Sequence, residues 1–309
     1  MSSAARCSVR VARSPFEDCD GSMTWANDSQ TLFFAELDET HRPHKLFRHT
    51  LGETAAHEVF HEADGRFFLH CYRSSSERQL ILLLNSKTTS ETWVLDADQP
   101  QQAFNCLAPR LEGHDYSVDH GLYEGQWAWF IRTNQDGINF ALYYALGDLP
   151  HRDEWQRLIA HDDRVMLEGL SLNANALCLS LREGGLPIIE IRPNGLPAYR
   201  VQLPDAAYSL YVQDSLEFHS AHIRLRYESL NRPAQVRRLT LTNGAPDHGP
   251  GDLSAEPVRA LSQQYCRADP LVRLHHGHLT CFRHCQQPYC ESKPTPLFRL
   301  RGQLDTCSQ

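Results

Sequence analysis

Short apolar segments alternate with polar turns along most of this chain. Five times an apolar segment runs into a turn and then into a second apolar segment, and the first segments begin near Thr31, Phe67, Trp127, Ala176 and Ile223. The spacings between these starts are 36, 60, 49 and 47 residues. A repeat of this length built from short strands is typical of β-propellers, in which each blade is a four-stranded antiparallel sheet. The pattern therefore predicts an all-β fold, a partial β-propeller of about five blades.

The residues between paired segments favour tight reversals. Examples are NQDG at 134–137, EGG at 183–185 and NRP at 231–233, because Gly, Asn, Asp and Pro adopt the backbone angles that hairpins need. The segment 153–159 (DEWQRLI) has some helical character. It is equally compatible with a turn that precedes a strand.

The pattern stops at both ends of the chain. Residues 245–309 show neither strand alternation nor a sustained helical period, and they are rich in Cys and His. Residues 1–15 are equally unlike the repeats. We therefore predict an irregular N-terminal segment at 1–15, the partial propeller at 16–244 and an irregular Cys/His-rich tail at 245–309.

Charge is distributed unevenly between these parts. The formal net charge is −8, but 1–15 carries +3, 245–309 carries +1 and 16–244 carries −12. An acidic body disfavours nucleic acid as a partner and suits cationic partners, although a solvated acidic surface produces the same composition. No run approaches the ~18 continuous apolar residues of a membrane span, so we expect a soluble protein with no membrane partner.

The N-terminus lacks the apolar core of a secretory signal. It is rich in Arg and Ser and poor in acids, as transit peptides are, but it is short. Five of the ten cysteines are scattered through 1–244, where single cysteines in apolar strands behave as small buried hydrophobes. A reducing cytoplasm is the expected location.

The densest group of potential metal ligands lies in the tail, in HHGHLTCFRHCQQPYC at 275–290. Imidazole and thiolate at such close spacing can bind Zn²⁺, and the candidates are His278, Cys281, Cys285 and Cys290. The spacing matches no standard zinc pattern, because there is no CxxC and His284 adjoins Cys285. We therefore expect an unstructured tail and no metal or other cofactor.

Nucleophilic catalysis is not indicated. An exposed catalytic serine of the α/β-hydrolase type sits in a GxSxG turn, and this motif is missing from the sequence. The histidines fall where surface or turn positions account for them. We therefore predict no catalytic residue in the chain.

The segment GHDYSVDHG at 113–121 is the most polar stretch between predicted blades. On one interpretation it is a turn whose acidic and imidazole side chains face a channel and contact a cationic ligand; these are His114, Asp115, Asp119 and His120. On the other, Asp115 and Asp119 cap turns while Tyr116 and Val118 pack inward. We favour the second interpretation.

The sequence of residues 21–52 resembles that of a known protein family. GSMTWANDSQTLFFAELDETHRPHKLFRHTLG resembles the propeller of oligopeptidase B, a branch of the prolyl oligopeptidase family of serine peptidases. The positions that carry the resemblance are Gly21, Trp25, Asp28, Pro43, Leu46, Phe47, Arg48, His49, Leu51 and Gly52. It continues through SKTTSETWVLDAD (86–98), HDYSVDH (114–120), RTNQDGINFALY (132–143), VMLEGLSL (165–172) and RLRYESLNRPAQV (224–236), and covers about 16–244.

The resemblance implies a seven-bladed propeller over an α/β-hydrolase domain with a Ser-Asp-His triad, which cleaves short peptides after Arg or Lys while the propeller restricts access by size. This chain departs from that plan. From this comparison we expect early blades and the hydrolase domain to be missing, so that the family's catalytic and acidic specificity residues have no counterpart here. A frameshift at each end would account for both unfamiliar termini.

Two functions follow as hypotheses. The first is the substrate-gating propeller fragment of an oligopeptidase B-like peptidase, inactive without its hydrolase domain, whose parent enzyme acts on short basic peptides. The second is an autonomous propeller that binds a partner, with the tail as a possible metal site.

Overall fold

The computed structural model describes residues 19–213, 217–241, 272–275 and 278–281. Within these ranges the regular secondary structure is β-strand apart from a single 3₁₀ turn, η1 (Arg152–Glu154). The predicted boundaries at 15/16 and 244/245 lie outside the described residues.

Four described sheets have four antiparallel strands and a fifth has three, and each strand pairs with its neighbours in chain order. We call these sheets blades 1 to 5. Blade 1 contains β1 (Cys19–Trp25), β2 (Thr31–Leu37), β3 (Pro43–Thr50) and β4 (His57–His61). Blade 2 contains β5 (Phe68–Arg73), β6 (Gln79–Asn85), β7 (Ser90–Asp96) and β8 (Asn105–Ala108).

Blade 3 contains β9 (Tyr116–Tyr123), β10 (Gln126–Thr133), β11 (Ala141–Leu146) and β12 (Gln156–Ile159). Blade 4 contains β13 (Val165–Asn173), β14 (Ala176–Glu183), β15 (Leu186–Pro193) and β16 (Tyr199–Arg200). Blade 5 contains β17 (Tyr208–Gln213), β18 (His222–Ser229) and β19 (Arg232–Thr240).

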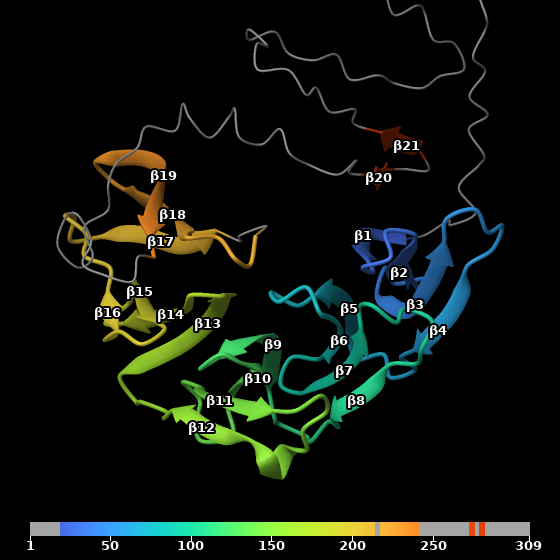
Figure 1. Ribbon diagram of the computed structural model, residues 1–309, viewed down its shortest axis with the longest axis horizontal. Helices are drawn as coiled ribbons and strands as arrows, with labels where there is room; N and C mark the ends of the chain where they lie inside the picture. The colour runs from blue at the N-terminus through green and yellow to red at the C-terminus, as the bar shows by residue number, and fades with distance from the viewer. Residues whose placement is uncertain (1–18, 214–216, 242–271, 276–277, 282–309) are drawn as a thin grey trace, which may run out of the picture.

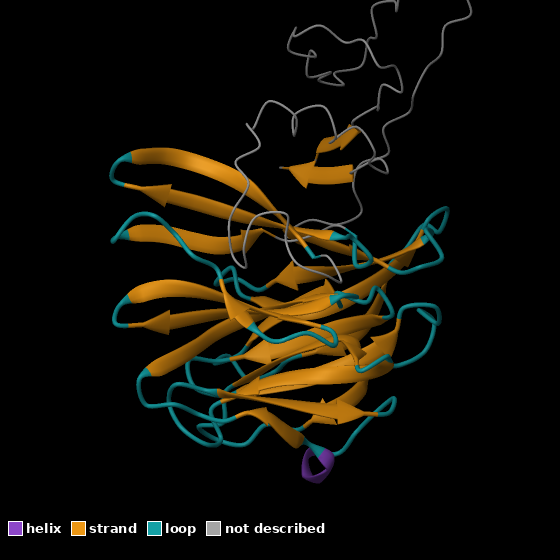
Figure 2. Ribbon diagram, turned by 60° about the vertical axis from the view of Figure 1, so that its left-hand side comes forward, coloured by secondary structure: helices purple, strands orange, loops and turns teal. Residues whose placement is uncertain are grey.

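The blades follow one another around an arc (Figure 1). The first strand of each of blades 1 to 4 lies on the inner side of the arc, and the fourth strand lies on its outer side; the first strands are β1, β5, β9 and β13, and the fourth strands are β4, β8, β12 and β16. Figure 2 shows the sheets as successive layers. In the described part of the chain no strand of blade 5 pairs with blade 1. The architecture is that of a partial β-propeller, as predicted.

The repeat is more regular than the sequence suggested. The second strands of the blades begin at residues 31, 79, 126, 176 and 222, which are 48, 47, 50 and 46 residues apart. The irregular spacings of 36 and 60 arose because the segment near Phe67 is the first strand of its blade, whereas the other four are second strands.

The second strands of blades 2, 3 and 4 (β6, β10 and β14) are apolar on both sides because each of these blades lies between two others. In β6, Leu80, Leu82 and Leu84 belong to the apolar cluster between blades 1 and 2, while Ile81 belongs to the cluster between blades 2 and 3. The same alternation occurs in β14, whose Leu179 packs toward blade 3 and whose Cys178 packs toward blade 5. These clusters form the core, and burial of apolar surface in them holds neighbouring blades together.

Three local predictions need correction or refinement. Residues 116–123 form strand β9, not a turn, because Tyr116, Val118 and His120 alternate inward. The segment 153–159 is not a helix: η1 ends at Glu154 and β12 follows, which is the turn-and-strand alternative. The tail is not wholly without strands, since β20 (Val272–His275) and β21 (His278–Cys281) form a two-stranded sheet.

Candidate functional site

The turn between β5 and β6 meets strand β9 of the next blade through paired polar side chains. The Asp119 carboxylate accepts hydrogen bonds from the Ser75 amide at 2.8 Å and from the Ser75 hydroxyl at 2.5 Å. The Ser76 hydroxyl lies 2.7 Å from Nδ1 of His120. The Ser76 amide also donates to the His120 carbonyl at 3.0 Å. These contacts bring a serine, a histidine and an aspartate together.

The Ser76–His120 pair has the separation of a nucleophile and its base, but its surroundings do not suit catalysis. His120 is 4% exposed, and its ring stacks on Trp127 with centroids 5.6 Å apart. Burial lowers the pKa of His120 to about 4, so the ring is neutral near pH 7. A triad needs the carboxylate on the ring nitrogen that does not face the serine, whereas Asp119 binds Ser75. The group therefore fastens blade 2 to blade 3.

Three of the described cysteines offer no nucleophile either. Cys71, Cys106 and Cys178 are free thiols. Burial raises the pKa of Cys71 and Cys178 to about 12 and that of Cys106 to about 11. Thiols with such values carry almost no thiolate at neutral pH, and the thiolate is the reactive form.

Side chains from two other blades lie close to the ring of Trp127, which belongs to blade 3. The guanidinium carbon of Arg78, from blade 2, lies 4.8 Å from the Trp127 ring centroid. The Phe218 ring, from the connector between β17 and β18, lies 6.0 Å from it. Since Phe218 also belongs to the apolar cluster between blades 3 and 4, the connector of blade 5 reaches two blades away.

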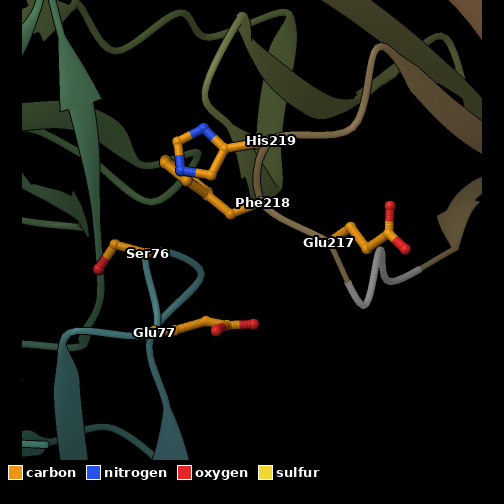
Figure 3. Close-up of a pocket in the computed structure, with 5 residues that line it drawn as sticks. All are labelled: Ser76, Glu77, Glu217, Phe218 and His219. Carbon is orange, nitrogen blue, oxygen red and sulfur yellow. The ribbon is translucent and has the colours of Figure 1, made fainter. Parts of the chain in front are cut away.

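A cavity of about 370 Å³ lies beside these side chains, lined by Ser76, Glu77, Glu217, Phe218 and His219 (Figure 3). Two of its five lining residues are glutamates, so its walls favour a cationic group. Glu77 is already 3.3 Å from the guanidinium of Arg73. The cavity opens to solvent, as the exposed Glu217 and His219 show.

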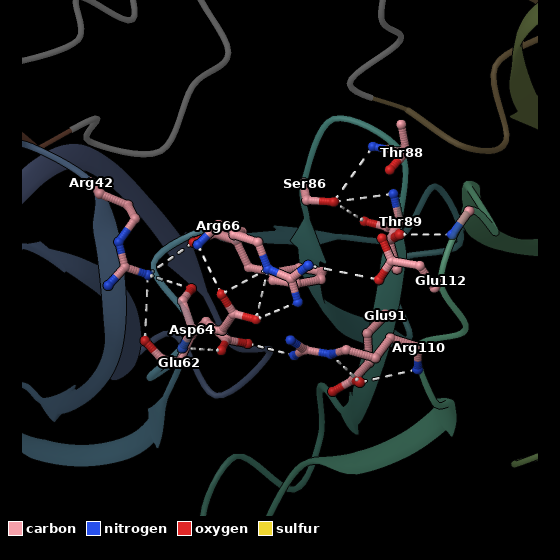
Figure 4. A network of polar contacts seen from close by, with 12 residues as sticks. Arg42, Glu62, Asp64, Arg66, Ser86, Thr88, Thr89, Glu91, Arg110 and Glu112 are labelled. Atoms are coloured by element: carbon pink, nitrogen blue, oxygen red, sulfur yellow. Dashed lines mark hydrogen bonds and ion pairs between the residues drawn. The ribbon is translucent and has the colours of Figure 1, made fainter.

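A second polar network links blades 1 and 2 (Figure 4). Arg110 Nη2 lies 2.5 Å from Oε2 of Glu62, and its Nε lies 2.8 Å from Oε2 of Glu91. Burial works against the Glu91 carboxylate, but hydrogen bonds from Arg110 and Trp93 outweigh it and lower the Glu91 pKa. Likewise burial opposes the charge on Arg110, while its bonds to Glu91 and Glu62 raise the Arg110 pKa.

Arg42 completes this network from the turn between β2 and β3. Its Nη1 donates to the carbonyl oxygens of Glu62, Asp64 and Phe67, at 3.4, 3.2 and 2.9 Å. Its Nε donates to Asp38 at 2.8 Å. These bonds occupy the guanidinium and fix the connector between the two blades, so the network is a structural clamp.

In the polar segment at 113–121, Tyr116 and Val118 pack inward as the second interpretation predicted, but Asp119 lies in strand β9 and not in a turn of this segment. Tyr116 and Val118 are 1% and 4% exposed. His114 is also buried, with Nε2 2.6 Å from the Thr133 hydroxyl, and Asp115 accepts from the Ser90 hydroxyl at 2.8 Å. Sequence reasoning missed the burial of both histidines. It also gave no signal for Phe218, which lies in a polar connector.

The four tail candidates are only partly described. His278 and Cys281 lie in β21, and Cys285 and Cys290 lie outside the described residues. Across the described part of the chain, no three His, Cys, Asp or Glu side chains are grouped to hold a metal ion. No described helix is long and apolar enough to cross a membrane.

The fold is an array of propeller blades that polar contacts join to one another. The family model "Prolyl oligopeptidase, N-terminal beta-propeller domain" matches residues 9–247. The chain therefore belongs to this family of peptidase propeller domains.

Two curated relatives show how much of a family member is present. The chain is 29% identical over 232 residues to dipeptidyl aminopeptidase BI of Pseudoxanthomonas mexicana, covering 74% of this chain and 31% of the relative. It is 28% identical over 227 residues to protease 2 of Moraxella lacunata, covering 72% and 32%. The chain thus spans about a third of the length of these relatives.

Solved structures share the fold. Oligopeptidase B from Trypanosoma brucei aligns with a TM-score of 0.68 and 22% identity, over 77% of this chain and 34% of that one. Oligopeptidase B from Leishmania major aligns with a TM-score of 0.67 and 24% identity, over 73% and 33%. The resemblance read from the sequence is confirmed for the propeller region.

Proposed function

We propose that this chain supplies the substrate-gating propeller portion of an oligopeptidase B-like serine peptidase that cleaves short peptides after Arg or Lys. The family match over residues 9–247 carries this proposal. In this role the chain does not hydrolyse peptides by itself and depends on an α/β-hydrolase domain as its partner. Short basic peptides are the substrates of the assembled enzyme, and nucleic acid is not a partner.

Two features of the described residues support a scaffold role. The Ser76–His120 pair is buried and lacks a carboxylate on the imidazole. The two glutamates that line the cavity give it a charge that attracts basic peptides. The free thiols of Cys71, Cys106 and Cys178 support a reducing compartment, and we propose the cytoplasm.

A chimaera tests the gating role. Residues 9–247 of this chain would replace the matching part of protease 2 of Moraxella lacunata. The expected result is cleavage of short Arg- and Lys-containing chromogenic peptides, while an unfolded polypeptide with the same cleavage sites is spared. A folded chimaera that cleaves both at equal rates would overturn the role.

The unmodified chain tests the predicted lack of activity. It is expected to leave the same chromogenic peptides intact. Turnover that a serine-directed inhibitor abolishes would show that the chain is a hydrolase in its own right.

A further inference from the structure

The described part of the connector between β17 and β18, residues 217–221, crosses from blade 5 to blade 3. On its way it lies against the turn between β13 and β14 of blade 4. The Ala174 amide donates to the Phe218 carbonyl at 2.9 Å, and the Asn173 side-chain amide donates to the Ser220 carbonyl at 2.9 Å. At its far end the Phe218 ring packs near Trp127.

The residues of this segment differ sharply in burial. Phe218 is 7% exposed, whereas its neighbours Glu217 and His219 are exposed. Figure 3 shows this segment on one side of the cavity, with Ser76 and Glu77 of blade 2 on the other. The segment is therefore a wall of the cavity, and Phe218 is its one buried side chain.

Residues 217–221 belong to no strand, so opening this segment does not require a sheet to separate. Segments held by few contacts open locally at much lower free energy than the sheets beneath them. The contacts of this segment include the Phe218 ring, hydrogen bonds from the Ala174 amide and the side-chain amides of Asn173 and Asn175, and a hydrogen bond from the Leu241 amide to the Ala221 carbonyl at 2.7 Å.

We propose that residues 217–221 are a strap that opens and closes the cavity beside Glu77, and that Phe218 is its latch. With Phe218 seated, the strap closes one wall of the cavity. With Phe218 released, the wall moves away and the half-buried Trp127 ring becomes more accessible. The use of this motion to control peptide access rests on the proposed function, but the motion itself does not.

Amide hydrogen exchange on the full chain tests the latch. The reporter is the Ala174 amide, which is bonded to the strap, and the amides of β10 and β14 report on the blades. Phe218→Ala is expected to speed exchange at Ala174 about 10- to 100-fold, the range that loss of a buried Phe side chain corresponds to. Phe218→Leu, which keeps an apolar contact, is expected to stay close to wild type.

Leu230→Ala is the matched control, because Leu230 is a large apolar residue of the same blade that is 96% exposed. It is expected to leave Ala174 exchange unchanged. Acrylamide quenching gives a second readout: Phe218→Ala is expected to add quenching that disappears when Trp127→Phe is added.

Unchanged exchange at Ala174 in Phe218→Ala would overturn the latch. Exchange that rises equally at Ala174, β10 and β14 would also overturn it, because Phe218 would then be an ordinary core residue. If Phe218→Ala does not fold, Phe218→Val is judged by the same two criteria. Since peptide cleavage is not measured here, failure of the latch is distinct from failure of the proposed function.

Discussion

The guanidinium carbon of Arg110 lies 3.9 Å from the ring centroid of Phe67. Phe67 is 1% exposed and belongs to the core between blades 1 and 2. The same guanidinium binds Glu62 and Glu91. One side chain therefore covers an apolar core residue and pairs with two carboxylates whose side chains are only 6% and 11% exposed.

Replacing Arg110 with Met keeps the apolar cover on Phe67 but leaves both carboxylates without their cation. Because uncompensated buried charge is costly, we expect Arg110→Met to lower the free energy of unfolding by about 3–5 kcal/mol. Urea denaturation followed by circular dichroism measures the change. Arg66→Met is the control, since the Arg66 side chain is 65% exposed and its pair with Asp64 is screened by solvent. Equal losses in the two variants would contradict the clamp.

Much of this fold could be predicted from the sequence, because most second strands are strongly apolar. The runs that contain Phe33, Leu82 and Phe130 stand out for this reason. The sequence did not show that the segment near Phe67 is the first strand of blade 2, because β5 also carries apolar residues and resembles a second strand. Only pairing with β6 reveals its place.

The polar contacts between blades were beyond sequence reasoning. Ser76 and His120 are 44 residues apart, and nothing local to either indicates that the other is near. Their burial follows from the packing of blade 2 on blade 3. The same holds for Phe218, whose partner Trp127 is two blades away.

The lowered pKa of Glu91 predicts a loss of stability in acid. Its carboxylate is favoured in the folded state, so its stabilising effect is complete above the ordinary glutamate pKa and is lost as the pH falls through the lowered value. In Glu91→Gln this contribution is missing. We expect the stability of wild type and variant to differ at pH 7 and to converge as the pH falls below 4. A difference that stays constant with pH would contradict this.

The pKa of Asp119 is shifted in the opposite direction from that of Glu91. Burial raises its pKa even though Ser75 and His120 donate hydrogen bonds to it. The folded state therefore favours the protonated form, and this group's contribution to stability falls as the pH rises from the ordinary aspartate pKa through the raised one. Asp119→Asn keeps the shape and has no charge to bury. Relative to wild type, it is expected to become more stable as the pH rises from 4 to 7, as thermal melts at several pH values would show.

Ser76→Ala separates a structural role from a catalytic one. The change removes the hydroxyl from buried Nδ1 of His120 and is expected to cost about 1–3 kcal/mol of stability. Ser22→Ala is the control, because Ser22 is an exposed serine of β1 whose hydroxyl bonds only locally to Asp20. Covalent labelling of Ser76 by a serine-directed inhibitor, detected by mass spectrometry, would contradict the structural role.

Gly137 lies against the imidazole of His161, and a Cβ placed there would be 2.4 Å from Nε2. Because the ring is packed between blade connectors, Gly137→Ala is expected to lower the free energy of unfolding by about 1–3 kcal/mol. Gly65→Ala is the control, since nothing lies within 4 Å of its Cβ position.

The double variant Gly137→Ala/His161→Ala decides whether the clash is the cause. Removing the ring makes room for the new methyl group, so the Gly137→Ala change should cost much less in the His161→Ala background than in wild type. The four urea midpoints of this double-mutant cycle measure the coupling. If the two changes were simply additive, the loss in Gly137→Ala would come from the backbone rather than from contact with His161.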